Sequence, residues 1–530
     1  MRAQIKKASR WLRALPSSRP EFEPTLIAAV LSLGAVLATL RGADYPAQYF
    51  RAAIYKADGF TIWNNAWYSG HFTPSYSLIA PVLSAWFGPI AVAVGSSVAA
   101  AYFMGRLAAI APSPLSRWGA VLFAISTVSN VLIGRTAFAL GMAIGLWSLD
   151  AWFHSRRRFA LALALLAGLS TPVASVFLGL AAGAIAFTRL LQSPTRRIEP
   201  WSAALWLCAV APLAAFSVAF GSDGIFRFEP VAFALCVVAT VGIVAVTDNR
   251  TTIIGVSASA LAAVAFFVID NPMGGNFQRL PMFFAGALAL FMARPNRAKL
   301  ALALGVFFTG WAVFPAATAS VDAYRDPSRH EAYYAPHVNY IEWHGDDNSR
   351  IEIPFTLNHW ESFYVAKKFS LARGCERQAD REVNPLFYDL TTTPEQYHAW
   401  LLDRAVRWVA LPDVALDRGG QIEADLLANE HDWLVPVWEN EHWKVWEVVD
   451  STPILAAPAE LIHLGYDNIT IRSTTASSTV LRIRYMPYWT VEGPATISPT
   501  EDGLTEIQFF HPGEIRLSAR FEWRDLFSNS

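Results

Sequence analysis

Charged residues are scarce in this chain. They make up 16% of its 530 residues, whereas about a quarter of the residues are charged in a typical soluble domain. The deficit is confined to residues 24–324, an almost unbroken series of apolar runs, while residues 325–530 have the composition of a water-soluble protein. The formal net charge of −1 argues against bulk electrostatic attraction to nucleic acid. The sequence therefore predicts a membrane-embedded part followed by a soluble part.

Cysteine is also scarce, with three residues in the whole chain. Cys208 and Cys236 lie inside apolar runs, where a free thiol behaves as a small hydrophobic group, and Cys375 stands alone in the soluble part. This spacing matches neither a disulfide framework nor a zinc site.

Eleven segments are candidates for crossing the hydrocarbon core of a bilayer, which needs about 20 apolar residues. They are residues 24–41, 79–105, 117–130, 135–154, 158–171, 172–190, 200–220, 229–246, 252–269, 279–294 and 299–321. Every second connection between them is rich in Arg and Lys, as cytoplasmic loops are. The alternation predicts a multi-pass plasma-membrane protein with a cytoplasmic N-terminus and an uncleaved first span. It places the loop 42–78 and the region 325–530 on the extracytoplasmic side.

Several cations contradict this charge rule, because they fall on the predicted outer side. A single cation near a bilayer is explained by its long side chain, which reaches the interface. As a set facing one side, they favour an anionic ligand such as a lipid phosphate. For Arg279 the structural alternative is an ion pair with Asp270. The set consists of Arg41, Arg51, Lys56, Arg135, Arg227 and Arg279.

The first predicted outer loop begins with Asp44, directly after the first span. Because Pro46 follows closely, Asp44 has the pattern of a helix N-cap. The functional alternative is a carboxylate at the membrane surface that acts as a general base. The segment 47–56 is amphipathic and predicts a helix that lies flat in the membrane interface. Asp58 precedes a glycine, which is typical of a turn.

Aromatic and amide side chains are concentrated in "IWNNAWYSGH" and in "IDNPMGGNFQRLP". Tryptophan and tyrosine at this depth usually anchor a protein in the interface. Flat aromatic faces beside amides also suit a sugar ring with its hydroxyl groups. A histidine here is suited either to a structural hydrogen bond or to a phosphate or hydroxyl ligand. The candidates for contacts with a sugar or an acceptor are Asp58, Trp63, Asn64, Asn65, His71, Asn276 and, from the soluble part, His359.

The soluble part divides by pattern into two units. Residues 325–452 mix short strand-like runs with helix signals such as "TPEQYHAWLLDRA", and predict a mixed α/β domain. Residues 453–530 contain strand-like runs separated by turn signals, and predict a small β-sandwich. The charge-rich segment 358–377 is either a structural network or a part that overhangs the active site and selects the acceptor.

Together these features resemble the GT-C superfamily of polyprenyl-phosphate-sugar-dependent glycosyltransferases, and more narrowly its actinobacterial-type membrane proteins. The matching segments are "WNNAWYSGHFTPSYSLIAPVLSAWFG" in the first loop, "GNFQRL", "NHWESFYVAKKFSLARGCERQADREVNPLFYD" and "RWVALPD". Only Asp44 corresponds to a functional position of the superfamily. Some relatives carry paired acids in this loop, whereas Asp44 and Asp58 are fourteen residues apart here.

The resemblance implies an inverting transfer of a sugar from a polyprenyl-phosphate donor to a cell-envelope glycan or glycolipid on the outer membrane face. Asp44 would take the proton of the acceptor hydroxyl, and Arg279, Arg135 and Arg51 would bind the donor phosphate. The first loop contains no Asp-x-Asp, so no cofactor is predicted and a divalent metal is not required. The Ala- and Arg-rich composition favours an actinobacterial envelope, and with it arabinose or mannose as the sugar.

Two other functions fit many of the same features. A transporter or flippase of a lipid-linked intermediate would explain the many spans and the outer arginines. Such a protein is expected to have polar residues near mid-membrane and an internal repeat, and the sequence shows neither. A non-catalytic scaffold that binds envelope polymer is opposed only by the charge-rich first loop.

Overall fold

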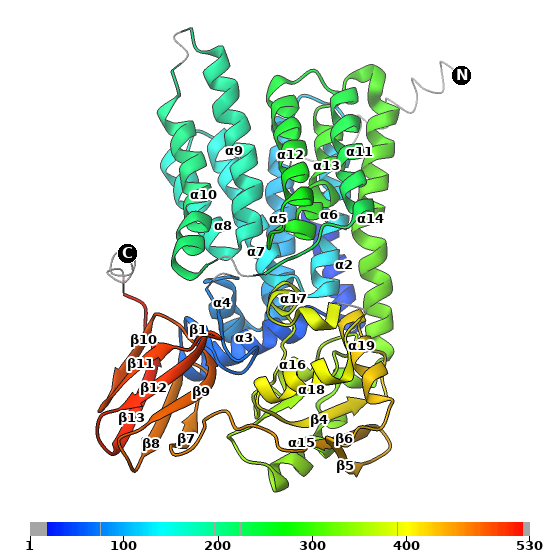
Figure 1. Cartoon of the computed structure of the whole chain (residues 1–530). Helices are drawn as coiled ribbons and strands as arrows, with labels where there is room; N and C mark the ends of the chain where they lie inside the picture. The colour runs from blue at the N-terminus through cyan, green and yellow to red at the C-terminus, as the bar shows by residue number, and fades with distance from the viewer. Residues whose placement is uncertain (1–18, 75, 195–196, 222–223, 389–390, 523–530) are drawn as a thin grey trace.

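The computed structural model describes residues 19–74, 76–194, 197–221, 224–388 and 391–522. The described residues from 22 to 325 are mostly helical and form a bundle, and the described residues from 326 to 522 form a strand-containing body at one end of that bundle (Figure 1). The basic segment 1–18 lies outside the described residues, and with it the prediction for the N-terminus.

The bundle helices follow the predicted apolar segments. They are α2 (Phe22–Leu37), α4 (Ala80–Phe87), α5 (Pro89–Ile110), α6 (Ser116–Ile133), α7 (Thr136–Phe153), α8 (Arg157–Ser170), α9 (Pro172–Gln192), α10 (Pro200–Phe220), α11 (Pro230–Val246), α12 (Arg250–Val268), α13 (Arg279–Phe291) and α14 (Ala298–Arg325). Among the described residues, 7 helices are long and apolar enough to cross a membrane. The count of eleven spans therefore stays a prediction.

The predicted span 79–105 is wrong as a single helix. Gly88 has φ +83°, a conformation that glycine adopts easily and other residues rarely do, and Pro89 then starts a new helix. The first piece, α4, has 8 residues and is far too short to cross a bilayer.

Helix α3 (Tyr45–Asp58) forms where an interfacial helix was predicted, and one part of its surface is buried. Its side chains Tyr45, Phe50 and Ile54 are buried in a core that also contains Trp360 and Val365 of the C-terminal body. Figure 1 places α3 at the end of the bundle that meets this body. The short hairpin of β1 (Trp63–Asn64) and β2 (His71–Phe72) follows it.

The first part of the C-terminal body is a mixed α/β unit. Its sheet has the order β3-β4-β6-β5, with β3 parallel to β4 and the other pairs antiparallel. The strands are β3 (Arg350–Glu352), β4 (Val406–Pro412), β5 (Leu434–Glu439) and β6 (Trp443–Val448). The helices are α15 (Glu331–His344), α16 (Glu361–Tyr364), α17 (Arg377–Val383), α18 (Pro394–Asp403) and α19 (Arg418–Leu427). The predicted start of α18 is confirmed, with a capping box between Thr393 and Gln396.

The last part contains two antiparallel sheets that share one hydrophobic core, which includes Ile471, Leu481, Ile507 and Leu517. One sheet has the order β10-β13-β8-β7 and the other β11-β12-β9. The strands are β7 (Glu460–Leu464), β8 (Asn468–Ser473), β9 (Ser478–Arg484), β10 (Trp489–Glu492), β11 (Ala495–Pro499), β12 (Leu504–Phe509) and β13 (Gly513–Ala519).

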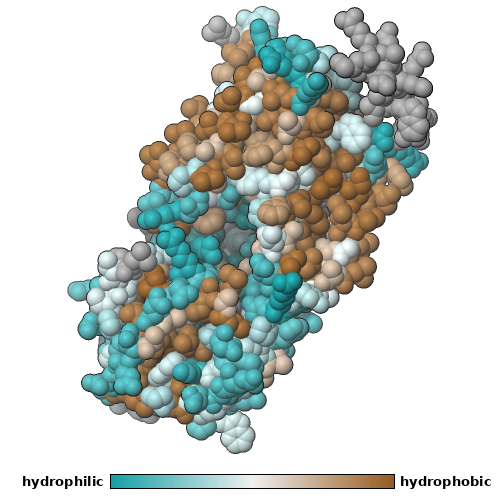
Figure 2. Space-filling view, turned by 90° about the vertical axis from the view of Figure 1, so that its right-hand side faces the viewer, coloured by the Kyte–Doolittle hydropathy of each residue, from teal (hydrophilic) through white to brown (hydrophobic). Residues whose placement is uncertain are grey.

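The surface reflects this division. Figure 2 shows hydrophobic residues over most of the helical part and mainly hydrophilic residues over the C-terminal body. A hollow lies at the junction between the two, bordered by hydrophilic residues. The junction is also where α3 and the connections α6–α7, α10–α11 and α12–α13 come together, because each of these connections leaves the bundle at that end (Figure 1).

Candidate functional site at the junction of the bundle and the C-terminal body

Asp44 is held against the end of α6 by backbone hydrogen bonds. The Asp44 amide donates to the Ile133 carbonyl at 3.0 Å, and the Gly42 amide donates to the Leu132 carbonyl at 2.8 Å. The next residue, Tyr45, donates its hydroxyl hydrogen to the Val131 carbonyl at 2.7 Å. Asp44 is therefore fixed beside the turn that connects α6 to α7.

The Asp44 side chain does not cap α3. Asp44 occupies the N-cap position, but its carboxylate accepts no hydrogen bond from the first turn of the helix. Within the described residues this carboxylate has no hydrogen-bond or ion-pair partner, and it is half-buried. The hydrogen-bonded N-cap interpretation is therefore wrong, and the carboxylate remains available.

Two arginines from distant parts of the chain approach this carboxylate. Arg135 precedes α7 and Arg279 begins α13, and both guanidinium groups are close enough to Asp44 to interact with its charge. The Nε of Arg135 is buried without a hydrogen-bond partner, and Arg279 lies over the Phe138 ring at 5.3 Å. Among the described residues neither arginine forms an ion pair; in particular the alternative Asp270–Arg279 pair is not formed.

Arg51 lies in the same region but its charge is already matched. It forms a short ion pair with Glu376, from the segment preceding α17, and stacks over the Tyr76 ring at 3.6 Å. His71 Nε2 lies 3.7 Å from the same Glu376 carboxylate. Burial opposes the ionisation of Glu376, but the charge of Arg51 and the contact with His71 outweigh it and lower the pKa of Glu376 to about 2.

Tyr76 connects these groups. Its ring supports Arg51, its hydroxyl accepts a hydrogen bond from Gln48 at 2.9 Å, and it is close enough to Asp44 and Arg279 to interact with their charges. Nothing in the local pattern of the sequence separates Tyr76 from an interfacial aromatic residue. Glu376 lies in the charge-rich segment 358–377, whose pattern does not distinguish it from its neighbours.

Two of the predicted sugar-binding residues, Trp63 and Asn65, contact the β-sandwich, and Asn64 forms a hydrogen bond within the first loop. Trp63 packs edge-on against Trp489 and donates to Asn65 Oδ1 at 2.8 Å. Asn65 in turn donates to the Gly465 carbonyl at 2.9 Å, and Asn64 accepts from the Ala66 amide at 3.0 Å. The polar side-chain atoms of Trp63 and Asn65 are thus hydrogen-bonded within the fold.

The remaining candidates are dispersed. Asp58 is exposed at the opposite end of α3, about 20 Å along the helix from Asp44 at 1.5 Å per residue. Asn276 lies in the short 3-10 helix η1 (Gly274–Gln278), directly before Arg279. His359 is buried in the C-terminal body, with its ring nitrogens 3.5 Å from Glu361 and 3.3 Å from Asp417.

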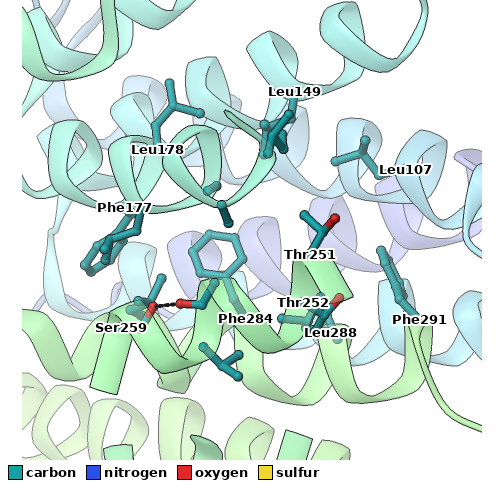
Figure 3. Close-up of a pocket in the computed structure, with 18 of the residues that line it drawn as sticks. Leu107, Leu149, Phe177, Leu178, Thr251, Thr252, Ser259, Phe284, Leu288 and Phe291 are labelled. Atoms are coloured by element: carbon teal, nitrogen blue, oxygen red, sulfur yellow. Dashed lines mark hydrogen bonds between the residues drawn. The ribbon is translucent and has the colours of Figure 1, made fainter. Parts of the chain in front are cut away.

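An apolar cavity of about 590 Å³ runs between the bundle helices. Near the junction its walls include Phe138, the ring beneath Arg279, together with Phe277 and Leu280. Arg189 and Asn249 line it at the other end of the bundle. Figure 3 shows its apolar walls, with Leu107, Leu149, Phe177, Leu178, Phe284, Leu288 and Phe291 among the labelled side chains.

No cluster of three or more His, Cys, Asp and Glu side chains suited to a metal ion occurs among the residues that the structure describes.

A scan against protein-family models finds no match, and no curated protein matches. Among solved structures, one that matches is the cryo-EM structure of the arabinofuranosyltransferase AftD from Mycobacteria, with 14% sequence identity and a TM-score of 0.41. The match covers 83% of this chain and 40% of the AftD chain, so this chain spans less than half the length of that protein.

Proposed function

We propose that this protein is an inverting glycosyltransferase that moves a sugar from a polyprenyl-phosphate donor to a cell-envelope glycan or glycolipid at the outer face of the plasma membrane. The observation that carries the proposal is the junction itself. There, the Asp44 carboxylate lies near two guanidinium groups, Arg135 and Arg279, and none of the three has an ion-pair partner among the described residues.

This arrangement suits a single displacement at the anomeric carbon. Asp44 would accept the proton of the acceptor hydroxyl as its oxygen bonds to that carbon. The bond from the anomeric carbon to the phosphate oxygen breaks at the same time, and the lipid phosphate leaves with additional negative charge. Arg135 and Arg279 would stabilise that charge, because fixed cations in a partly water-excluded site need little reorganisation during the reaction.

The apolar cavity supports a lipid donor. Its wall includes Phe138, which lies directly beneath Arg279, so a phosphate at Arg279 would have apolar space within reach for its tail. The hydroxyl groups of a sugar would find few hydrogen-bond partners on these apolar walls. Burial of each methylene of an isoprenoid chain, in contrast, is favourable by about 0.8 kcal/mol.

Arg51 is assigned a supporting role in this proposal. Because Glu376 neutralises it, Arg51 would bind phosphate only if the ion pair opened. While it is paired with Glu376, Arg51 stacks over the Tyr76 ring.

The first test is the substitution Asp44→Asn, assayed in membranes with a radiolabelled polyprenyl-phosphate arabinose or mannose donor. We expect transfer to fall by roughly 10²–10⁴-fold, the usual contribution of a general base. Asp502→Asn is the control, since it removes an exposed acid from the β11–β12 turn of the C-terminal body and should leave transfer unchanged. Full activity of the Asp44→Asn protein would overturn the assignment.

A flippase of lipid-linked intermediates is the second candidate, because the cavity extends to Arg189 and Asn249 at the opposite end of the bundle. Reconstitution in liposomes separates the two functions. Movement of a fluorescent polyprenyl phosphate across the bilayer, without sugar transfer and without dependence on Asp44, would favour the flippase.

A further inference from the structure

A second group of arginines lies beside the junction and takes no part in the site described above. We call it the arginine cluster; it consists of Arg227, Arg377, Arg381 and Arg418. Arg377 and Arg381 are one turn apart on α17 and therefore share a face of that helix. Arg418 follows Asp417, whose carboxylate accepts a hydrogen bond from Arg377 at 3.1 Å.

Arg227 joins this group from the membrane bundle. It belongs to the connection between α10 and α11, and two hydrogen bonds attach that connection to α17. The Ile225 amide donates to the Gln378 carbonyl at 3.1 Å, and the Gly224 amide donates to the Glu382 carboxylate. The cluster is thus assembled from the bundle and the C-terminal body together.

The cluster is short of negative charge. The Arg377–Asp417 contact is the one ion pair that its members make in the described part of the chain, and Asp417 is shared with His359. The nearby Glu382 is engaged by the Gly224 amide. Arg381 stacks over the Tyr388 ring at 4.6 Å. Partial burial lowers the pKa of Arg381, and the positive charges of Arg227, Arg377 and Arg418 lower it further.

The position of the cluster indicates what kind of anion it meets. Val218 at the end of α10, Val231 at the start of α11 and Ile269 after α12 are 77%, 74% and 63% exposed. These apolar side chains belong in lipid, so the connection that carries Arg227 lies where the hydrocarbon region gives way to headgroups. Arg227, Arg377 and Arg418 are exposed at this level.

We propose that the arginine cluster binds the phosphate of an anionic lipid headgroup, and so fixes the C-terminal body against the membrane surface. The planar guanidinium group pairs with phosphate oxygens through two parallel hydrogen bonds, and several such groups together neutralise one phosphate. The bound headgroup would relieve the repulsion between the four cations. This inference does not depend on the proposed sugar transfer.

The test uses the full chain in detergent micelles, titrated with fluorescent phosphatidylglycerol or with fluorescent phosphatidylcholine. The double variant R227Q/R381Q should bind phosphatidylglycerol roughly 30-fold more weakly, the loss expected when two cations leave a membrane surface. R472Q/R520Q is the matched control, because it removes two exposed arginines from the β-sandwich, and it should bind as the wild type does. Binding of phosphatidylcholine should be weak in all three proteins.

Competition distinguishes the two sources of phosphate. If inorganic phosphate or pyrophosphate alone binds with the same dependence on Arg227 and Arg381, the cluster is a site for a soluble phosphate and not for a headgroup. Should R227Q/R381Q fold poorly, the single variant R418Q replaces it, since Arg418 is exposed and its side chain forms no hydrogen bond or ion pair with the described residues. Equal binding of phosphatidylglycerol by wild type and folded variants, with no effect of phosphate, would overturn the proposal.

Discussion

His359 illustrates how single residues of the C-terminal body carry buried charge. Its ring lies between the carboxylates of Glu361 and Asp417, and its backbone has φ +56°. Burial by itself would lower the pKa of His359, but the nearby carboxylates of Asp417 and Glu361 outweigh burial and raise the pKa to about 9. The charged segment 358–377 therefore contributes ion pairs to the fold, which supports the structural interpretation of these charges.

This pKa predicts a loss of stability in alkali. Because the pKa of folded His359 lies above its unfolded value of about 6.5, the stabilisation is complete below pH 6.5 and is lost as the pH rises through 9. The shift corresponds to roughly 3 kcal/mol. Thermal unfolding of the full chain, followed by tryptophan fluorescence from pH 6 to pH 10, should show this decline.

The variant His359→Gln is expected to be less stable at pH 6 and to lack this part of the decline. His511→Gln, at an exposed position in the β12–β13 turn, serves as the control and should retain it. If the profile of His359→Gln fell as steeply as that of the wild type, another group would be responsible.

The turn between α6 and α7 is the element that positions Asp44. Gly134 in this turn has φ +94°, and a Cβ atom there would lie 2.7 Å from the Tyr45 amide nitrogen. The Asp44 amide donates a hydrogen bond to the carbonyl of Ile133, the residue before Gly134. The close approach of the two segments therefore requires glycine, for its conformation and for the missing side chain.

Gly134→Ala should displace the start of α3 and with it Asp44. Because Tyr45 must move for the methyl group to fit, we expect the initial rate of sugar transfer to fall more in Gly134→Ala than in the control Gly503→Ala, even where the two variants lose similar thermal stability. Gly503→Ala, at a positive φ with no atom within 4 Å of the added Cβ, costs only the backbone strain of about 1–2 kcal/mol. Initial rates and melting temperatures of both variants check this, and equal rates would show that the turn does not position the base.

The whole molecule combines a helical bundle that contains an apolar cavity with a C-terminal body at one end of that bundle (Figure 1). The body reaches back to the bundle through Glu376, which pairs with Arg51, and through α17, which binds the α10–α11 connection. In that connection the Phe226 carbonyl accepts a hydrogen bond from the amide of Gly275, a residue of η1, which directly precedes Arg279. The body thus contacts Arg51 of α3 directly, and it is linked to η1 through the α10–α11 connection.

Filling the cavity should weaken the use of long lipid donors. Ser259 faces the cavity, where its hydroxyl bonds to the Gly255 carbonyl at 2.8 Å (Figure 3). Ser259→Phe should raise KM for a long-chain polyprenyl-phosphate donor and leave KM for a short-chain donor nearly unchanged, because only the long tail needs the cavity. Ser257→Phe, which adds the same bulk on the exposed side of α12, is the control. An equal KM for the long donor in both variants would exclude the cavity as the tail site.

Local pattern in the sequence was enough for much of this protein. Hydropathy located the helices of the bundle to within a few residues, and "TPEQ" located the start of α18, because both signals act between neighbours along the chain. The same pattern singled out Asp44 as an acid directly after the first apolar helix. It failed at Gly88, where one continuous apolar run hides a break in the helix.

Only the tertiary structure decided which charges meet and which side chains are free. Arg51 and Glu376 are separated by 325 positions and form an ion pair. Trp63 and Asn65 contact the β-sandwich, and Tyr45, Phe50 and Ile54 of α3 pack in a core with the C-terminal body. The approach of Arg135 and Arg279 to Asp44 likewise depends on how α7 and α13 pack. Such contacts depend on how elements that are distant in the sequence pack together, and they cannot be predicted from the residues of any one segment.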